Sequence, residues 1–268
     1  MALKDITLGQ YFPGNSLIHR LDPRTKILFT LLYIVAIFLC KWVVSYGLTL
    51  AVLLVLIAIS RVKAKVFLKG MKPVVFIVVF TAILNLFYTS GNVLWSFGFL
   101  KITEEGLWKA AFMVLRILML IACTLLLTYT TSPILLTDGL EKLLRPLKKV
   151  NFPVHELAMM MSIALRFIPT LIQETDKIIS AQKARGADFD SGNLMQKAKA
   201  LIPILIPLFI SSFRRAEELA IAMECRCYHG DEGRTSLRQL TMKGRDVGFL
   251  IFSAALCGAV IALRVYGL

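Results

Sequence analysis

The sequence predicts an all-α, polytopic membrane protein with about five transmembrane helices and a cytoplasmic insert of crossed helices. Hydrophobic residues make up 57% of the 268 residues and charged residues only 18%, which is too apolar for an ordinary soluble domain. The charged residues gather in blocks and leave apolar runs near the ~20 residues that a helix needs to cross a bilayer. One long charged segment separates the fourth run from the fifth and predicts the insert.

Five apolar runs are expected to cross the membrane. They are Ile27–Cys40, Val43–Ser60, Pro73–Tyr88, Leu107–Thr130 and Val247–Val265. Only Lys41 and Trp42 separate the first two, which predicts a tight hairpin with the tryptophan at the membrane interface. The predicted divisions are an amino-terminal segment (1–26), four spans (27–131), the insert (132–245) and the last span (246–268).

Charge predicts the orientation of these spans in the plasma membrane. The first 26 residues are polar and contain Pro13, Gly14 and Pro23, so no cleavable signal peptide is expected. The connection after the second span is basic, whereas the opposite connections are mixed. The first carries Arg61, Lys63, Lys65, Lys69 and Lys72, and the others carry Lys41, Lys101, Glu104 and Glu105. The positive-inside rule therefore predicts that the amino terminus and the insert are cytoplasmic.

The insert is expected to form three helices. The first, from Ile134 to Lys149, has leucines at helical spacing and cations opposite them, so we expect it to lie along the membrane surface. The second begins near Pro153 and ends at Arg185, because Gly186 can adopt the left-handed conformation that ends helices. Pro169 removes a backbone donor within it and predicts a kink.

The third helix is expected from about Asn193 to His229. Pro203 and Pro207 should bend its first half. Its second half repeats small residues every fourth position, a pattern that favours close helix crossing. These are Ser212, Ala216 and Ala220, with Ala158 and Ser162 as candidates on the preceding helix. The sequence thus predicts two crossed rods.

Each rod ends in an arginine between small residues. The two sequences are Ala184-Arg185-Gly186 and Cys225-Arg226-Cys227. A cation in the last helical turn also stabilises the helix dipole by about 0.3 to 1 kcal/mol, which is the simpler interpretation of either arginine alone. Both arginines, however, have small neighbouring residues, which would let each guanidinium enter a groove of a partner and bind carboxylates or carbonyls there.

Several blocks along the chain resemble one known family. They are Tyr11–Ser16, His19–Lys26, Arg166–Pro169, Ala181–Ala187 and Ala222–Thr235. Together they are similar to the transmembrane component (EcfT) of energy-coupling factor transporters, a CbiQ-like family, and most closely to its shared-module type. The resemblance runs in order along almost the whole chain.

The resemblance implies the partners and the roles of several residues. Two ABC-type ATPases would bind from the cytoplasm, and one small, possibly exchangeable, membrane S-component would bind a vitamin or related micronutrient. ATP and magnesium would belong to the ATPases, and this chain would hold no cofactor. Arg185 and Arg226, with the flanking Ala184, Gly186, Cys225 and Cys227, would dock the two coupling helices on the ATPases. Met159, Met160, Met161 and Met223 are candidates for an adaptable surface facing the S-component.

Four other functions are weighed against this hypothesis. A free-standing carrier or channel would need polar or charged residues repeated along several spans, but these spans are nearly all apolar apart from Asn85 and Arg116. A membrane enzyme could use the glutamates near the second arginine, though these can pair with nearby cations. Cys225, Cys227 and His229 lack the usual zinc spacing, so no metal is expected. The net charge of +14 lies mainly at membrane borders, so nucleic acid is not expected as a partner.

Overall fold

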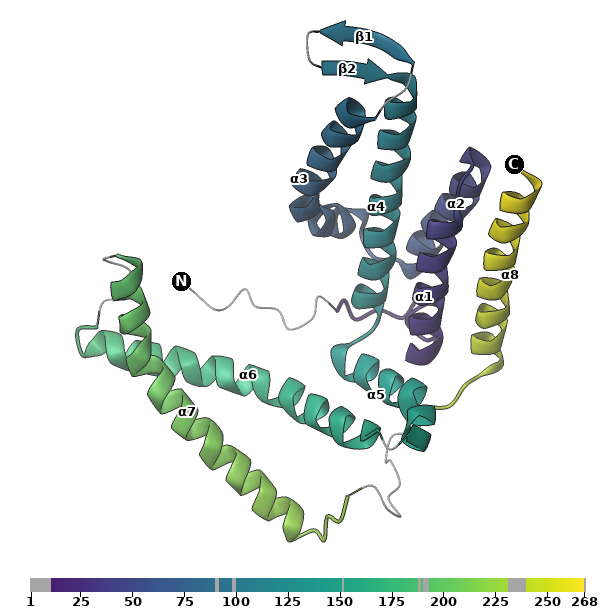
Figure 1. Ribbon diagram of the computed structural model, residues 1–268. Coiled ribbons are helices and arrows are strands. Elements are labelled where there is room, and N and C mark those ends of the chain that lie inside the picture. The colour runs from purple at the N-terminus through teal and green to yellow at the C-terminus, as the bar shows by residue number, and fades with distance from the viewer. Residues whose placement is uncertain are drawn as a thin grey trace. The chain divides into compact units, whose positions relative to one another are not determined.

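The computed structural model describes residues 11–89, 92–97, 100–150, 152–187, 189, 193–230 and 240–267. Helices dominate it, which confirms the predicted all-α class (Figure 1). They are α1 (Pro23–Leu39), α2 (Val43–Ser60), α3 (Ala64–Tyr88), α4 (Glu104–Thr130), α5 (Pro133–Leu144), α6 (Val154–Ala184), α7 (Leu194–Glu224) and α8 (Gly244–Tyr266). The predicted amino-terminal segment is described only from Tyr11 onward.

The chain divides into two compact units. The membrane unit contains Gly9–Leu140 and Leu240–Leu268, and the inserted unit contains Glu141–Gln239. The inserted unit therefore interrupts the membrane unit in the sequence. Its boundaries lie inside the predicted insert of 132–245, because most of α5 belongs to the membrane unit.

The predicted spans correspond to helices in the membrane unit. α2 has the predicted bounds, and α1 begins earlier because Asp22 caps it by accepting a hydrogen bond from the Arg24 amide at 2.9 Å. α3 is the main correction, since it begins at Ala64 rather than Pro73. The basic residues read as a loop are therefore partly helical, which is reasonable because lysine is a good helix former.

Among the described residues, five helices are long and apolar enough to cross a membrane. These are α2, α3, α4, α6 and α8. This set differs from the prediction in one helix. The predicted span at α1 is left out because α1 has only 17 residues, and the 31-residue α6, which was predicted to belong to the insert, is included. By length and composition alone, α6 is the least apolar of the five.

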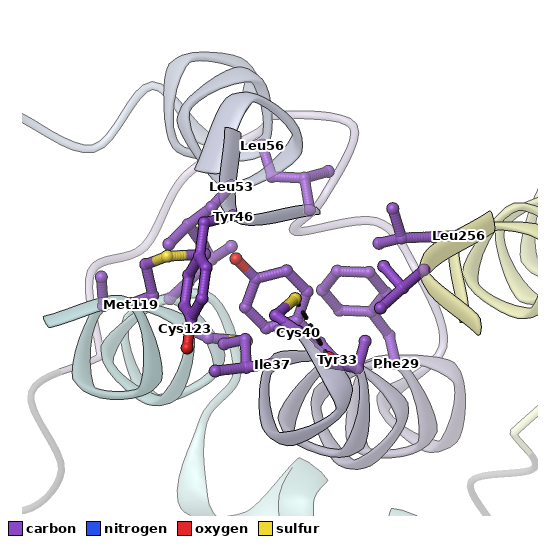
Figure 2. Packing of buried hydrophobic residues seen from close by; sticks show 14 of the residues in the cluster. Phe29, Tyr33, Ile37, Cys40, Tyr46, Leu53, Leu56, Met119, Cys123 and Leu256 are labelled. Atoms are coloured by element: carbon purple, nitrogen blue, oxygen red, sulfur yellow. Dashed lines mark hydrogen bonds between the residues drawn. The ribbon is translucent and has the colours of Figure 1, made fainter. Parts of the chain in front are cut away.

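The core of the membrane unit forms where α1, α2, α4 and α8 meet. Phe29, Tyr33 and Ile37 of α1 are buried against residues of the other three helices, as Figure 2 shows. Those partners include Tyr46, Leu53 and Leu56 of α2, Met119 and Cys123 of α4, and Leu256 of α8. The Tyr33 hydroxyl donates to the Thr49 carbonyl of α2 at 3.0 Å, which satisfies its polar atom inside the core. α1 is therefore the central helix of this unit.

A short β-hairpin connects α3 to α4, which the sequence interpretation missed. Strands β1 (Val93–Phe97) and β2 (Leu100–Thr103) pair antiparallel, with a register shift between Val93 and Trp95. Aromatic and β-branched residues on both sides of a glycine are the sequence signal that could have predicted it. Thr103 then caps α4 by accepting from the Gly106 amide at 3.1 Å.

The inserted unit consists mainly of two long helices that cross, as Figure 1 shows. α6 and α7 have 31 residues each. The capping box of Asn193 and Gln196 begins α7, at the predicted position. Pro169, Pro203 and Pro207 all lie within continuous helices, and the predicted kinks at these residues stay predictions.

Candidate functional site

The end of α6 is a two-hydrogen-bond turn with Arg185 at its centre. The Gly186 amide donates to the Lys183 carbonyl at 2.9 Å, and the Ala187 amide donates to the Gln182 carbonyl at 3.0 Å. Gly186 has a φ of 88°, a left-handed conformation that glycine adopts without steric cost. This pattern is a Schellman motif, so Arg185 is held at the position where the helix stops.

The end of α7 repeats this geometry. The Cys227 amide donates to the Glu224 carbonyl at 2.8 Å, and the Tyr228 amide donates to the Met223 carbonyl at 3.1 Å. Cys227 takes the left-handed position with a φ of 55°. Arg226 therefore precedes the left-handed residue, as Arg185 precedes Gly186, although the flanking residues differ.

Both arginines are exposed and available to a partner. All six predicted docking residues, Ala184, Arg185, Gly186, Cys225, Arg226 and Cys227, are exposed in the chain. We call Ala184–Gly186 and Cys225–Cys227 the two tips. Within the described residues, neither tip arginine is held in an ion pair. A guanidinium at a helix end can then offer its donors to a carboxylate or to carbonyl oxygens.

Where the two helices cross, a polar contact joins them. Glu174 of α6 accepts a hydrogen bond from Arg215 of α7 at 2.8 Å and a short one from the Ser211 hydroxyl. The Arg215 guanidinium also lies over the Phe167 ring, 5.8 Å from its centre. Gln182 donates to the Pro203 carbonyl at 3.4 Å. Charge-assisted hydrogen bonds therefore fix the register in which the helices cross.

The predicted small-residue crossing face was wrong. Ala216 and Ala220 are exposed, and the face of α7 turned inward carries Ser211 and Arg215. Arg215 binds Glu174 of the other helix rather than a glutamate of its own. Ile204, Ser211 and Arg215 recur at spacings of seven and four residues, which place them on one face of a helix and could have identified this face.

Comparison with known proteins decides the family. The CbiQ family model, described as cobalt transport protein, matches residues 14–237. The energy-coupling factor transporter transmembrane protein EcfT of Ruminiclostridium cellulolyticum is 57% identical over 245 residues, covering 91% of this chain and 92% of that protein. The chain belongs to the CbiQ family and, within it, to the EcfT proteins. Proteins of the same name from Thermosediminibacter oceani and Bacillus subtilis are 52% and 48% identical, each covering 98% of this chain and 99% of the relative.

This EcfT chain is thus a multi-pass transmembrane component of an energy-coupling factor transporter. The family finding confirms the resemblance from which the sequence analysis inferred function. It does not by itself assign roles to single residues.

The four methionines predicted to face the S-component lie on α6 and α7 with different exposure. Met160 and Met161 are about half exposed, at 54% and 46%. Met159 and Met223 are partly buried. An exposed methionine can repack against partners of different shape, so Met160 and Met161 offer an adaptable apolar surface.

The two polar residues inside the spans of this EcfT chain have structural partners. Arg116 of α4 donates to the Tyr46 hydroxyl at 3.0 and 2.5 Å and lies over the Phe38 and Tyr46 rings. Asn85 of α3 donates to the Thr81 carbonyl and to the Met113 sulfur of α4, both at 2.9 Å. Each side chain therefore holds helices of the membrane unit together.

The structure gives little support to a metal site or an enzyme active site near the end of α7. His229 places its Nδ1 at 2.8 Å from the Cys227 carbonyl, so this ring nitrogen completes the turn at the tip. In the described part of the chain, no group of three or more His, Cys, Asp or Glu side chains could hold a metal. Glu217, Glu218 and Glu224 are exposed on α7 rather than gathered in a buried site.

Proposed function

We propose that this chain couples ATP hydrolysis by two ABC-type ATPase subunits to reorientation of a vitamin-binding S-component. The ATPases bind the tips of α6 and α7 from the cytoplasm and supply ATP and magnesium. Their closure moves the two crossed helices. The helices in turn move the small membrane subunit that holds the vitamin or related micronutrient.

The observation that carries this proposal is the matched geometry of the two tips. Two helix ends of different sequence present an exposed arginine before a left-handed residue, with the same pair of backbone hydrogen bonds. A helix-dipole role would need only a cation near each end. Matched, exposed ends instead favour docking on two similar partner surfaces.

Contacts within the membrane unit support a cytoplasmic position for the amino terminus. Five spans put the amino-terminal segment, the start of α3, the end of α4 and the start of α8 on one side. These segments are in contact, since Phe12 N donates to the Tyr129 carbonyl at 3.0 Å and the Tyr129 hydroxyl to the Val66 carbonyl at 3.4 Å. Asp22 N donates to Asp246 at 2.7 Å. The basic start of α3 makes this side cytoplasmic.

We assign α1, rather than α6, to the set of five spans, which are then α1, α2, α3, α4 and α8. α1 is the central helix of the membrane unit, and its 17 residues lie at the short end of the range for spanning helices, about 17 to 25 residues. α6 carries Arg166, Glu174, Asp176 and Lys177 along its length, and a charged side chain at a bilayer centre costs about 2.5 to 3.5 kcal/mol on insertion scales. α6 and α7 therefore belong to the cytoplasmic side.

The exposed apolar side chains of the crossed helices support contact with a membrane subunit. α7 exposes a series of large side chains in its first half, and Met160 and Met161 of α6 add to the apolar surface. The series comprises Leu201, Ile202, Leu205, Ile206, Phe209, Ile210 and Phe213. An apolar surface of this size indicates an interaction site. The partner proposed for it is the S-component, exchangeable in a shared module.

Charge reversal at both tips tests the proposal. Arg185→Glu combined with Arg226→Glu should abolish copurification of the ATPases, because the tip guanidinium groups would be replaced by carboxylates in the same grooves. The membrane spans should insert normally. The measurement is the amount of each ATPase recovered with the tagged chain from membranes in mild detergent.

Arg214→Glu is the matched control, since it reverses an exposed arginine of α7 that does not lie at the tip. We expect this variant to recover the ATPases as the unmodified chain does. Normal ATPase recovery with the double tip variant would contradict the assignment of Arg185 and Arg226 as docking residues.

A further inference from the structure

Two connections join the inserted unit to the membrane unit, and both begin beside the same turn of α1. The first follows α4 through Thr130 and Thr131 into α5. The second returns at Leu240 and leads to Asp246 at the start of α8. All of these residues belong to the membrane unit. Their contacts with the turn at Asp22–Lys26 determine how each connection is held.

Lys26 holds the first connection. Its Nζ donates to the Thr130 carbonyl at 2.9 Å and to the Thr131 hydroxyl at 3.3 Å. A third hydrogen bond reaches the His19 carbonyl at 3.4 Å. All three donors of the ammonium group are therefore used. Two of the three fix the end of α4, from which the chain continues through α5 to the inserted unit.

Asp22 and Arg24 hold the second connection. The Asp22 amide donates to Asp246 Oδ1 at 2.7 Å, and the Lys243 amide donates to Asp246 Oδ2 at 2.8 Å. Arg24 Nη2 donates to the Leu240 carbonyl at 3.1 Å. The start of α8 and the residue at which the chain re-enters the membrane unit are thus bound to α1.

We call Asp22, Arg24, Lys26 and Asp246 the α1 charge cluster. It contains two acids and two bases, and Asp22, Lys26 and Asp246 are only 7%, 5% and 3% exposed. Buried charges are costly unless their partners are fixed in place. Balanced charge and complete hydrogen bonding of Lys26 therefore make this cluster a rigid junction.

From these contacts we propose that the α1 charge cluster transmits movement of α6 and α7 into the membrane spans. The segments of the membrane unit that precede and follow the inserted unit both contact one turn of α1, and α1 carries Phe29, Tyr33 and Ile37 into the centre of the core. A movement of either connection is then conveyed to the core. Lys26 and Asp246 are positioning residues for coupling, a role that rests on the proposed function.

The test compares vitamin uptake with ATP hydrolysis in the same vesicles. The complete complex is purified from its native membrane and reconstituted into proteoliposomes that contain ATP. Only complexes whose ATPases point into the vesicle can use this ATP. Tritiated biotin, riboflavin, folate and thiamine serve as separate probes outside. Lys26→Met and Asp246→Asn should each retain the ATPases and hydrolyse ATP, while vitamin taken up per ATP falls at least about fivefold, the lower range of energetic coupling between sites.

Arg116→Gln is the matched control for loss of a buried polar contact in the same unit. Arg116 joins α4 to Tyr46, about 20 Å along the helix from Thr130. It should lower the yield of complex without changing uptake per ATP. Lys26→Arg, which keeps a cation and its donors, should recover most of the ratio.

The outcomes separate the two proposals. An unchanged ratio in Lys26→Met and Asp246→Asn, or an equal fall in Arg116→Gln, would overturn the role of the α1 charge cluster. If the unmodified complex takes up none of the four vitamins and hydrolyses no ATP, the proposed function itself fails, and this inference with it.

Discussion

At the scale of single residues, the two tips have the same backbone geometry from different sequences. Gly186 was predicted to end α6 because glycine adopts a positive φ readily, and the structure confirms this end. Nothing in the sequence predicted that Cys227 would take the same conformation, since only the hydrogen bonds to Glu224 and Met223 reveal it. The docking roles of both tips stay predictions.

The left-handed conformation of Cys227 makes a specific prediction. Cys227→Gly should stabilise the end of α7 by about 1 kcal/mol, because a side chain in this conformation costs roughly 1 to 2 kcal/mol. Slower amide hydrogen exchange at Tyr228 in the purified chain would measure the gain. Cys225→Ala, at a residue with ordinary helical φ, should leave the exchange unchanged.

The same positions separate docking from metal binding. A chain carrying Cys225→Ala and Cys227→Gly should bind the ATPases and support uptake normally, because both replacements stay small. Loss of uptake in this variant, with intact assembly, would point to thiol chemistry at the tip and against the present interpretation.

At the scale of elements, helix order and most helix ends were predictable, whereas helix contacts were not. Apolar runs and capping residues gave α2 and the start of α7 at the predicted positions. The start of α3 was misplaced because its first turns carry lysines, which were read as a loop. The crossing face was misread because small residues suggested close packing, while an ion pair between Glu174 and Arg215 determines it.

The crossing predicts a specific dependence on pH. Hydrogen bonds from Ser211 and Arg215 hold the pKa of Glu174 below its usual value of 4.5. Because the pKa is lowered on folding, the ionised carboxylate stabilises the crossing at neutral pH, and this contribution is lost as the pH falls through the lowered pKa. The distance between spin labels on α6 and α7 should therefore stay constant from pH 8 to about 5 and broaden only at lower pH.

Glu174→Gln should weaken the crossing at neutral pH by about 1 kcal/mol, because it removes a charge-assisted hydrogen bond. Its label distances should be broad already at pH 7 and insensitive to acid. Glu218→Gln, on the exposed face of the same pair of helices, is the matched control. A narrow, unchanged distribution in Glu174→Gln would show that apolar packing alone holds the helices.

At the scale of the whole molecule, the sequence was enough to predict a multi-pass protein with an inserted helical unit. Composition could not decide which helices cross the membrane, because α6 meets the length and composition criteria while α1 is too short to meet them. The position of α1 in the core of the membrane unit is the reason for proposing α1 as a span. The α1 charge cluster was likewise hidden, because Asp22 and Asp246 lie at opposite ends of the sequence.

We propose above all that this EcfT chain couples ATPases to a substrate-binding membrane subunit. The most direct measurement is native mass spectrometry of the tagged chain from its own membranes in mild detergent, together with its rate of ATP hydrolysis. We predict one copy of this chain with two ABC-type ATPase subunits, a small hydrophobic protein and measurable hydrolysis. Recovery of the chain alone, without ATPases and without hydrolysis, would contradict the coupling role and favour a free-standing carrier.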